Sequence, residues 1–447
     1  AATFAGYTAG DIMGLALNVD DSEITFYKNN SSQGTSSFGT NLTAASFVTS
    51  GGSLYDSTDC YNFGQDSSFA GAETAQGNQD SNGVGDFYYT PPTDFLALCT
   101  SNLDAPSIKL PGDNFNTVIY TGNGTVIGSG GNAITGVGFK PDTTWIKKRS
   151  GGTVRNHALF DVIRGATWSL TPNLTDAQGE QTEQLASFDS DGFTLGNNTT
   201  VNTSGQTYVG WNWLAGGDAG SSNTDGATNT TSTSANVTAG FSISTIPAYG
   251  AGNNTTFGHG LSAAPTFVIM KATNGIDQWT VGHSSMGSWG KGIALNSDGA
   301  EDSNATFFNS TAPTASVVSL GSWDATYARV AYCFHEVEGY SKFGSYDGNS
   351  STDGTFVYTG FKPAFIMIKG TAASRAWPMY DNKRDTYNVA FHDVRANDNA
   401  AEETPYLIDY VSNGFKLRIS DTLTNATSNT YLYMAFAESP FKYANAR

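Results

Sequence analysis

Two glutamates in the last third of the chain have the spacing of a catalytic carboxylate pair. Glu336 and Glu338 lie in the segment FHEVEGYSKFGSYDG, residues 334–348. Residues i and i+2 of a strand point to the same face, and glycoside hydrolysis needs two acids about 5–10 Å apart. However, the pair lies where one sequence repeat passes into the next, so a salt bridge between repeats explains it equally well. We therefore predict a structural role for both residues and no enzymatic activity.

Two aspartates resemble part of a calcium-binding loop. Asp189 and Asp191 stand in the segment FDSDGF, residues 188–193. A complete loop needs more oxygen ligands and a distal Glu. Asn413-Gly414 occupies the matching place in a later repeat, and Asn-Gly is typical of a plain turn. We therefore expect no cofactor, with calcium as the alternative.

Three tryptophans are candidates for sugar binding. Trp168, Trp289 and Trp323 lie close to expected turns, where an exposed indole ring offers a flat apolar face to a glycan. A single aromatic residue near a turn is more often packed against the core, and the sequence leaves both interpretations open.

The overall composition limits the partners of the chain. The 447 residues carry a net charge of −18, and only 14% are charged while 13% are aromatic. A nucleic-acid-binding protein needs a basic surface and an anionic membrane would repel this chain, so we expect neither nucleic acid nor membrane insertion. Cys60, Cys99 and Cys333 are odd in number and far apart. Their spacing predicts buried free thiols rather than a zinc site or disulfides, and synthesis in a reducing compartment.

One short pattern occurs three times. It reads GFKPDTTWIKK from Gly138, GLSAAPTFVIMKA from Gly260 and GFKPAFIMIKG from Gly360. In each copy a proline is followed six residues later by a lysine, which gives the pairs Pro141 and Lys147, Pro265 and Lys271, and Pro363 and Lys369. Proline cannot donate to a β-ladder, and the run after it is too short for a helix and too apolar for a half-exposed strand. Each copy therefore predicts a strand that begins after the proline and is buried on both faces.

Matching strands at similar offsets extend each repeat to about a hundred residues, the size of a β-sandwich domain. Aromatic residues alternate in the closing strands YVGWNW (208–213), RVAYCF (329–334) and YLYMAF (431–436), as sheets packed face to face require. We therefore expect an all-β chain of tandem antiparallel β-sandwich modules, of jelly-roll or concanavalin-A-like type, each enclosing its own apolar strands. No linker separates the last two repeats, which should form one rigid body. The expected parts are a partial sandwich at 1–77, a linker at 78–112, repeats at 113–217, 240–337 and 338–447, and a Ser/Thr/Gly-rich linker at 218–239.

Two segments of the N-terminal region predict strands. The segment GLALNVDDSEITFYKNN (14–30) predicts two strands joined by the turn Asp20-Asp21-Ser22, and SLYDSTDCYNFGQ (53–65) predicts another strand. Together they resemble the second half of a SPRY-type, concanavalin-A-like sandwich, whose pattern falls on Ile24, Phe26, Tyr27 and Asn29, and on the closing-strand residues Asn62, Phe63, Gly64 and Gln65. The first half of such a domain is missing, so it lies upstream in the intact polypeptide or the sandwich is completed in another way.

Residues 80–447 are similar to structural proteins of tailed bacteriophages, especially marine ones, which carry repeated β-rich modules. The resemblance depends on long motifs, among them GFKPDTTWIK, FDSDGFTLG, YVGWNWLAGG and AYCFHEVEGYSKFGSY. It implies a virion protein, made in the host cytoplasm and located on the virion surface in a tail fibre, tail tip or similar appendage. It also implies other virion proteins as partners, a homo-oligomer (three-fold by analogy), and lectin-like attachment to host-surface glycans. A capsid-decorating (head-fibre) protein and a polysaccharide depolymerase are the alternatives.

Overall fold

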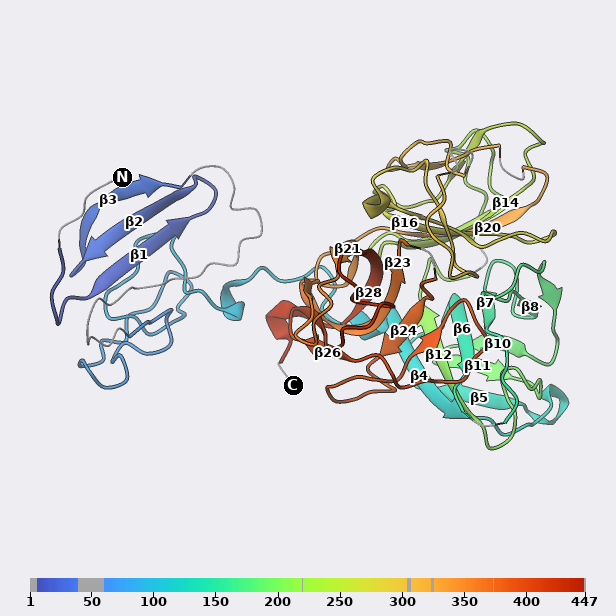
Figure 1. Cartoon of the computed structure of the whole chain (residues 1–447), viewed down its shortest axis with the longest axis horizontal. Helices are drawn as coiled ribbons and strands as arrows, with labels where there is room; N and C mark the ends of the chain where they lie inside the picture. The colour runs from blue at the N-terminus through green and yellow to red at the C-terminus, as the bar shows by residue number, and fades with distance from the viewer. Residues whose placement is uncertain are drawn as a thin grey trace. The chain divides into compact units, whose positions relative to one another are not determined.

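The chain forms two compact units built from β-strands. The computed structural model describes residues 6–38, 60–150, 152–218, 220–303, 307–322, 325–372 and 374–445. The first unit is Ala1–Asp104 and the second is Ala105–Arg447 (Figure 1). Neighbouring strands in every sheet run antiparallel. The helical elements among the described residues are short 3-10 turns: η1 (Thr100–Asn102), η2 (Pro111–Asp113), η3 (Ile127–Ser129), η4 (Ser284–Met286) and η5 (Phe441–Tyr443). The all-β class expected from the sequence is confirmed.

The first unit contains one three-stranded sheet followed by loops. Its strands pair in chain order and are β1 (Met13–Asn18), β2 (Glu23–Lys28) and β3 (Ser31–Ser37). The two strands expected within residues 14–30 are therefore present. Ser22 lies in the turn between them and takes a left-handed backbone conformation with a φ of 56°.

The closing strand expected at residues 62–65 is not formed. The Asn62 side-chain oxygen accepts the backbone N–H groups of Gly64, Gln65 and Asp66, at 2.7, 2.9 and 3.2 Å. An Asn side chain that satisfies successive N–H groups turns the chain back on itself and competes with a ladder. Residues 53–59 of the same expected strand lie outside the described residues.

The second unit consists of three modules that repeat one strand plan, seen in Figure 1 as a cyan-to-green, a yellow and an orange-to-red body. Each module has a large sheet and a small sheet. The strands of each large sheet are given in pairing order. The first module has β4 (Phe115–Thr121), β12 (Thr207–Trp213), β6 (Thr143–Lys148) and β7 (Ala158–Asp161). The second has β13 (Ser232–Asn236), β14 (Phe241–Ile246), β20 (Arg329–Phe334), β16 (Phe267–Ala272), β17 (Thr280–His283) and β18 (Ile293–Ala294), and the third has β21 (Ser341–Asp347), β28 (Thr430–Pro440), β23 (Phe361–Gly370), β24 (Pro378–Asp381) and β25 (Val394–Arg395). The small sheets are β10 (Leu185–Asp189), β11 (Gly192–Leu195) and β5 (Asn132–Thr135); β15 (Thr255–Gly258) and β19 (Val317–Leu320); and β22 (Phe356–Tyr358), β27 (Gly414–Leu417) and β26 (Ile408–Val411). A short ladder of β8 (Trp168–Ser169) and β9 (Gly179–Glu180) completes the set.

The three proline–lysine runs occupy equivalent places in the large sheets. Each run lies between the closing strand of its module and the next strand along the chain, as β6, β16 and β23. The same register is repeated three times, with Trp213 paired to Thr143, Phe334 to Phe267 and Phe436 to Phe365. Pro141 and Pro265 precede their strands, whereas Pro363 lies inside β23 where the register shifts. A register shift tolerates proline because the missing N–H is not required for the ladder there.

Each large sheet is buried on both faces, and this overturns one expectation. One face packs on the small sheet of its own module, so that Ile146, Val268 and Ile366 belong to three separate apolar clusters. The opposite faces of all three large sheets meet in a single shared cluster, with members such as Trp145, Tyr332 and Phe365. We expected each module to enclose its own apolar strands. Since alternate residues of a strand point to opposite faces, a strand that is apolar on both faces can serve two cores at once.

The segment 218–239, interpreted as a linker from its composition, contains an edge strand. Within it β13 pairs with β14, and Thr230 is buried. Gly220 has a φ of 70°, and a Cβ atom there would lie 2.2 Å from the carbonyl oxygen of Thr233. Small residues therefore allow the backbone to pack closely at this edge.

The three cysteines are free thiols, but only Cys333 is buried. Cys60 and Cys99 are exposed, so the expectation that all three are buried is wrong. Both exposed cysteines lie in the part of the first unit that follows its sheet, where loops enclose little apolar volume. Within the described ranges, no helix has the length and apolar character needed to cross a membrane.

Candidate functional site

The three repeated lysines join the modules. The side chains of Lys147, Lys271 and Lys369 are fully buried, and each ammonium group donates to backbone carbonyls of a different module. We call each contact between two modules a seam. Lys271 of the second module reaches Thr175 O of the first at 3.1 Å, and Lys369 of the third reaches Gly299 O of the second at 2.8 Å. Lys147 of the first reaches Asn399 O of the third at 3.3 Å, which closes a ring.

Backbone hydrogen bonds repeat at each seam beside the lysines. The carbonyl two residues after each lysine accepts an N–H group from the same neighbouring loop. The three bonds are Gln178 N to Thr273 O (3.0 Å), Glu301 N to Thr371 O (2.9 Å) and Glu402 N to Arg149 O (2.9 Å). The three seams therefore share one backbone geometry.

A ring nitrogen crosses each seam as well. Trp279 Nε1 donates to Thr171 O and Trp377 Nε1 donates to Ala294 O, at 3.1 and 3.0 Å. In the first module His157 takes this place, 2.9 Å from Arg395 O through Nε2. A carbonyl only accepts, and Trp145 donates to His157 Nδ1, so the imidazole is neutral with its proton on Nε2. Burial, with the nearby charge of Lys147, keeps the pKa of His157 well below its usual value.

One asparagine per module orients these rings. Its side-chain oxygen accepts the backbone N–H of the ring-bearing residue, in the pairs Asn173 with His157, Asn296 with Trp279, and Asn397 with Trp377. The carbonyl two residues after each asparagine is the one that accepts from a lysine, at Thr175, Asp298 and Asn399. Sequence reasoning missed this asparagine, although its spacings of 123 (296 − 173) and 101 (397 − 296) follow those of the repeated prolines, 124 and 98.

The seams lower the pKa values of the lysines that they bury. Burial is the main cause of the fall in the pKa of Lys147, to about 8, and of the pKa of Lys369, also to about 8. Ammonium groups in apolar surroundings lose hydration, which favours the neutral amine. Hydrogen bonds to the carbonyl acceptors replace part of those to water. The lysines therefore connect the modules and are not exposed binding groups.

The third–first seam is filled by a network of charged side chains. Glu402 accepts three hydrogen bonds from Arg149, at 3.1, 3.2 and 2.9 Å, and one from Arg384 at 3.3 Å. Arg384 Nε lies 2.6 Å from Asp381 Oδ2, which also accepts from Trp211 Nε1 at 3.1 Å. Both Asp381 and Arg384 have fully buried side chains. The charges are therefore paired with one another within the seam.

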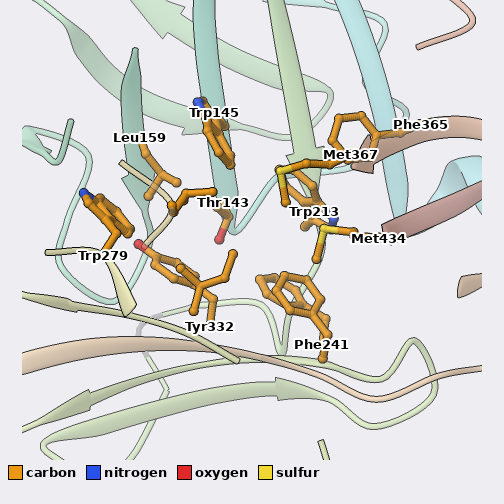
Figure 2. Close-up of a pocket in the computed structure, with 13 residues that line it drawn as sticks. Thr143, Trp145, Leu159, Trp213, Phe241, Trp279, Tyr332, Phe365, Met367 and Met434 are labelled. Atoms are coloured by element: carbon orange, nitrogen blue, oxygen red, sulfur yellow. The ribbon is translucent and has the colours of Figure 1, made fainter. Parts of the chain in front are cut away.

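The shared core leaves a small cavity where the large sheets meet. Figure 2 shows Trp145, Trp213, Tyr332 and Phe365 around it, and the cavity has a volume of about 20 Å³. A single water molecule needs about 10–15 Å³ on this measure, and two or more polar partners. The lining is almost wholly aromatic and aliphatic, so we interpret this cavity as a packing defect and not as a binding site.

A larger and polar cleft lies next to the second–third seam. Its volume is about 300 Å³, and its lining combines carboxylates, an arginine, an amide and hydroxyl groups. Asp298 comes from the second module, while Arg395, Asn397, Tyr406 and Asp421 come from the third. A cleft of this size is at the lower end of the range for small-molecule sites.

Arg395 forms one wall of the cleft and is held by acids. Its Nε lies 3.4 Å from Asp393, its Nη1 lies 3.9 Å from Asp398 and its Nη2 contacts Glu403. The guanidinium also lies 5.5 Å from the centre of the Tyr406 ring. Burial is the main cause of the rise in the pKa of Asp393, to about 7. Burial likewise raises the pKa of Tyr406, which keeps its hydroxyl protonated.

The match to a known family covers all of this architecture. Residues 110–440 match a family model described as "Domain of unknown function (DUF7483)". The chain belongs to this family. The DUF7483 region extends from β4 to β28, so a complete ring of three modules, and not one module, is what the family model describes. No curated protein sequence and no solved structure matches the chain.

The expected calcium ligands of the DUF7483 region are engaged in a hairpin. Asp189 accepts from the hydroxyls of Ser187 and Thr194, both at 2.7 Å. Asp191 accepts the N–H groups of Gly136 and Gly138, at 3.0 and 2.7 Å, and the Gly138 bond is the main cause of its lowered pKa. Among the described residues, no three His, Cys, Asp or Glu side chains are grouped as metal ligands would be. Both carboxylates are thus engaged in hydrogen bonds within the first module.

The expected sugar-binding tryptophans lie in different places. Trp289 is buried and packs edge-on against Phe308, with ring centres 5.2 Å apart, so it has no open face for a glycan. Trp168 is half-buried in β8, and Trp323 lies outside the described residues. Neither Trp168 nor Trp289 lines the cleft, and sequence reasoning missed its residues Arg395, Tyr406 and Asp421 because no local pattern marks them.

The glutamate pair lies in the turn between the second and third modules. Glu336 accepts from Lys342 Nζ at 2.9 Å and from the Phe343 N–H at 3.0 Å. Glu338 is exposed. Glu336 therefore holds the turn into β21, which favours the structural interpretation of the pair.

Proposed function

We propose that this protein is a structural component of a tailed-phage virion, located in a tail fibre, tail tip or similar surface appendage, where it presents a surface for attachment to the host. The main support is the closed ring of three modules. Three equivalent seams, each with a buried lysine and a repeated backbone bond, connect β-sandwiches that share one core. A ring of this kind resists deformation because no module can separate without exposing apolar surface.

The resemblance of residues 80–447 to phage structural proteins supports the same proposal. The net charge of −18 favours a soluble and mutually repelling particle component. Loops at the module surface are free to vary while the seams hold the ring, which suits a protein that displays binding loops. Other virion proteins are the proposed partners, with glycans of the host surface as the proposed ligands.

Within one chain the ring already supplies three equivalent modules. A trimeric appendage would obtain the same number of modules from three chains. The homo-oligomer that we propose is therefore an assembly of several chains, each of which forms a complete ring. The number of copies per particle and their location test it.

Immunogold electron microscopy of purified particles, with antibodies raised against the full chain, tests the proposal. We expect gold label on the particle surface, and quantitative mass spectrometry should find several copies per particle. Label at the tail supports the appendage, and label over the capsid favours the head-fibre alternative. Presence of the protein in infected cells but not in washed particles would contradict a structural role.

A further inference from the structure

The polar cleft beside the second–third seam contains hydrogen-bonding groups that the fold does not use. Among the described residues, the side chains of Asp298, Ser374 and Tyr406 and the Nδ2 group of Asn397 make no hydrogen bond to protein, and neither does Asp421 Oδ2. Asn397 Nδ2 and the Tyr406 hydroxyl are donors, and the carboxylate oxygens are acceptors. A cleft of about 300 Å³ that holds both kinds of group is prepared for a ligand whose own groups both donate and accept.

The backbone around these groups is fixed by the seam. The Asp298 carbonyl accepts from Lys369 Nζ at 3.2 Å and from the Arg375 N–H at 2.9 Å. The Asn397 oxygen holds the Trp377 N–H at 2.9 Å, and Asp421 Oδ1 holds the Leu423 N–H at 2.6 Å. Each of these three residues thus has one side engaged in structure and another side on the cleft. A preorganised site loses less entropy when a ligand binds.

The charge of the cleft argues against an anionic ligand. Three carboxylates line it, from Asp298, Asp398 and Asp421, against one arginine. The guanidinium of Arg395 is already paired with Glu403 behind the cleft and lies 3.9 Å from Asp398, so little positive charge remains for an anion. A simple cation would need several converging oxygens, and the presence of Asn397 and Tyr406 donors does not suit it.

We infer that this cleft binds a neutral sugar residue through its vicinal hydroxyl groups. A sugar hydroxyl donates to a carboxylate and accepts from an amide or a phenol, which is the pairing that Asp298, Asp421, Asn397 and Tyr406 offer. The volume of the cleft, about 300 Å³, is at the lower end of the range for small-molecule sites, which suits a small ligand such as a sugar residue. The inference rests on the proposed attachment role, since it names the class of ligand that the ring would recognise.

The first module provides an internal comparison. The Thr199 carbonyl accepts from the Tyr208 hydroxyl just as the Thr422 carbonyl accepts from Tyr431, so the two threonines are equivalent. In the first module, Arg155 Nε donates to Thr199 Oγ1 at 3.1 Å. In the third module, Thr422 lines the cleft instead. The same backbone position is therefore engaged by protein in one module and lies on the polar cleft in the other.

Isothermal titration calorimetry on the full chain tests the inference. The probes are methyl glycosides of glucose, galactose, mannose and N-acetylglucosamine, and sialic acid and glucuronate represent anionic sugars. We expect saturable binding of at least one neutral probe, with a dissociation constant in the millimolar range or tighter. Tyr406→Phe and Asp298→Asn should each weaken it at least tenfold. The first removes the phenol hydroxyl and the second replaces a carboxylate acceptor with an amide donor, and both keep the size of the side chain.

The matched control is Tyr387→Phe, which removes a phenol of the third module that is 78% exposed and does not line the cleft. It should leave affinity unchanged, and all variants should keep the unfolding midpoint of the parent chain. Three outcomes would each overturn the inference. They are the absence of binding heat from every neutral probe at 20 mM (about ten times a typical weak dissociation constant), tighter binding of the anionic probes, and unchanged affinity in the cleft variants. This outcome does not depend on where the protein lies in the particle. If no sugar binds, the proposed structural role is unaffected. If a sugar binds but the protein is absent from particles, the sugar site stands and the structural role is wrong.

Discussion

The third–first seam and the second–third seam share their backbone contacts and differ in their side chains. Both have a buried lysine that donates to carbonyls across the seam and a backbone bond two residues later. At the third–first seam, Arg149, Glu402 and Arg384 form a closed charged network. At the second–third seam, Glu301 takes the place of Glu402 and accepts from Lys291 of its own module at 2.6 Å, and the polar cleft lies beside this seam with Asp298 in its lining.

This difference separates what holds the ring from what the ring displays. The backbone contacts occur three times, so they belong to the repeat and are insensitive to the side chains around them. Side chains beside those contacts vary, and one seam has become a solvent-accessible polar site. Function in a repeat protein lies in the positions where the copies differ, because the shared positions are committed to the fold.

The largest effect should come from breaking the charged seam with Arg384→Met. The substitution leaves Asp381 buried without its cation and removes one partner of Glu402. Removing one member of a buried ion pair typically costs about 3–5 kcal/mol, so we expect the free energy of unfolding of the second unit to fall by that amount. Urea unfolding of the full chain, followed by tryptophan fluorescence, measures it.

Lys416→Met is the control for that experiment. Lys416 pairs with Asp353, whose side chain is 83% exposed, and exposed pairs contribute about 0–1 kcal/mol. Equal losses for Arg384→Met and Lys416→Met would show that the buried pair of Arg384 and Asp381 contributes no more than an exposed pair.

A smaller and more local effect is expected from Lys369→Met. The ammonium donates to the carbonyls of Asp298, Gly299 and Arg375, and leaving buried acceptors unsatisfied costs about 1–3 kcal/mol. Hydrogen–deuterium exchange should accelerate at the Glu301 N–H, which crosses the second–third seam, because that bond lies beside the lost lysine.

The Gln178 N–H of the first–second seam is the internal reference for Lys369→Met. Its exchange should change little, and Lys271→Met should reverse the pattern by exposing Gln178 and sparing Glu301. Acceleration at both seams in either variant would mean that the ring opens as a whole and that the seams are not separable.

The sequence predicted the class of fold because its strongest signals are local. A proline followed by an apolar run and a lysine predicts a buried strand, and β6, β16 and β23 have that place. The same runs are apolar on both faces, which predicts a separate apolar core within each module. In the structure, Trp145 packs in the core that all three modules share, and its neighbour Ile146 packs in the core within the first module. Which core each face meets depends on contacts between modules that no local window contains.

The candidate site could not be predicted for the same reason. Asp298 and Tyr406 are more than a hundred residues apart and come together only because the second module packs on the third. Neither stands in a recognisable motif. The lysines were identified by spacing alone, and their role as connectors followed only from carbonyls such as Asn399 O, 252 residues from Lys147. Of the candidate tryptophans, Trp289 is a core residue, which is one of the two interpretations that the sequence leaves open.

The smallest effect should be the pH dependence of the free energy of unfolding that Asp393, behind the cleft, contributes. Burial raises the pKa of Asp393 to about 7, with Arg395 and Arg384 acting against the rise, while its unfolded value is about 3.9. A carboxyl whose pKa is raised on folding contributes stability that is complete below about pH 4 and is lost as the pH rises through 7. The free energy of unfolding should therefore fall between pH 6 and pH 8, by about 1–2 kcal/mol for this group.

Asp393→Asn removes the titrating proton and keeps the shape of the side chain, so the part of the decline that extends above pH 6 should disappear. The decline near pH 6 should persist, because burial also raises the pKa of Asp142 to about 6. Asp353→Asn is the control: hydrogen bonding to Lys416 lowers the pKa of Asp353, so its contribution is already complete at pH 5 and the profile above it should not change. Urea unfolding at half-unit pH steps checks all three proteins. An unchanged profile in Asp393→Asn would mean that Asp393 stays ionised beside Arg395, and the acids behind the cleft would then hold that arginine as firmly as Glu402 holds Arg149.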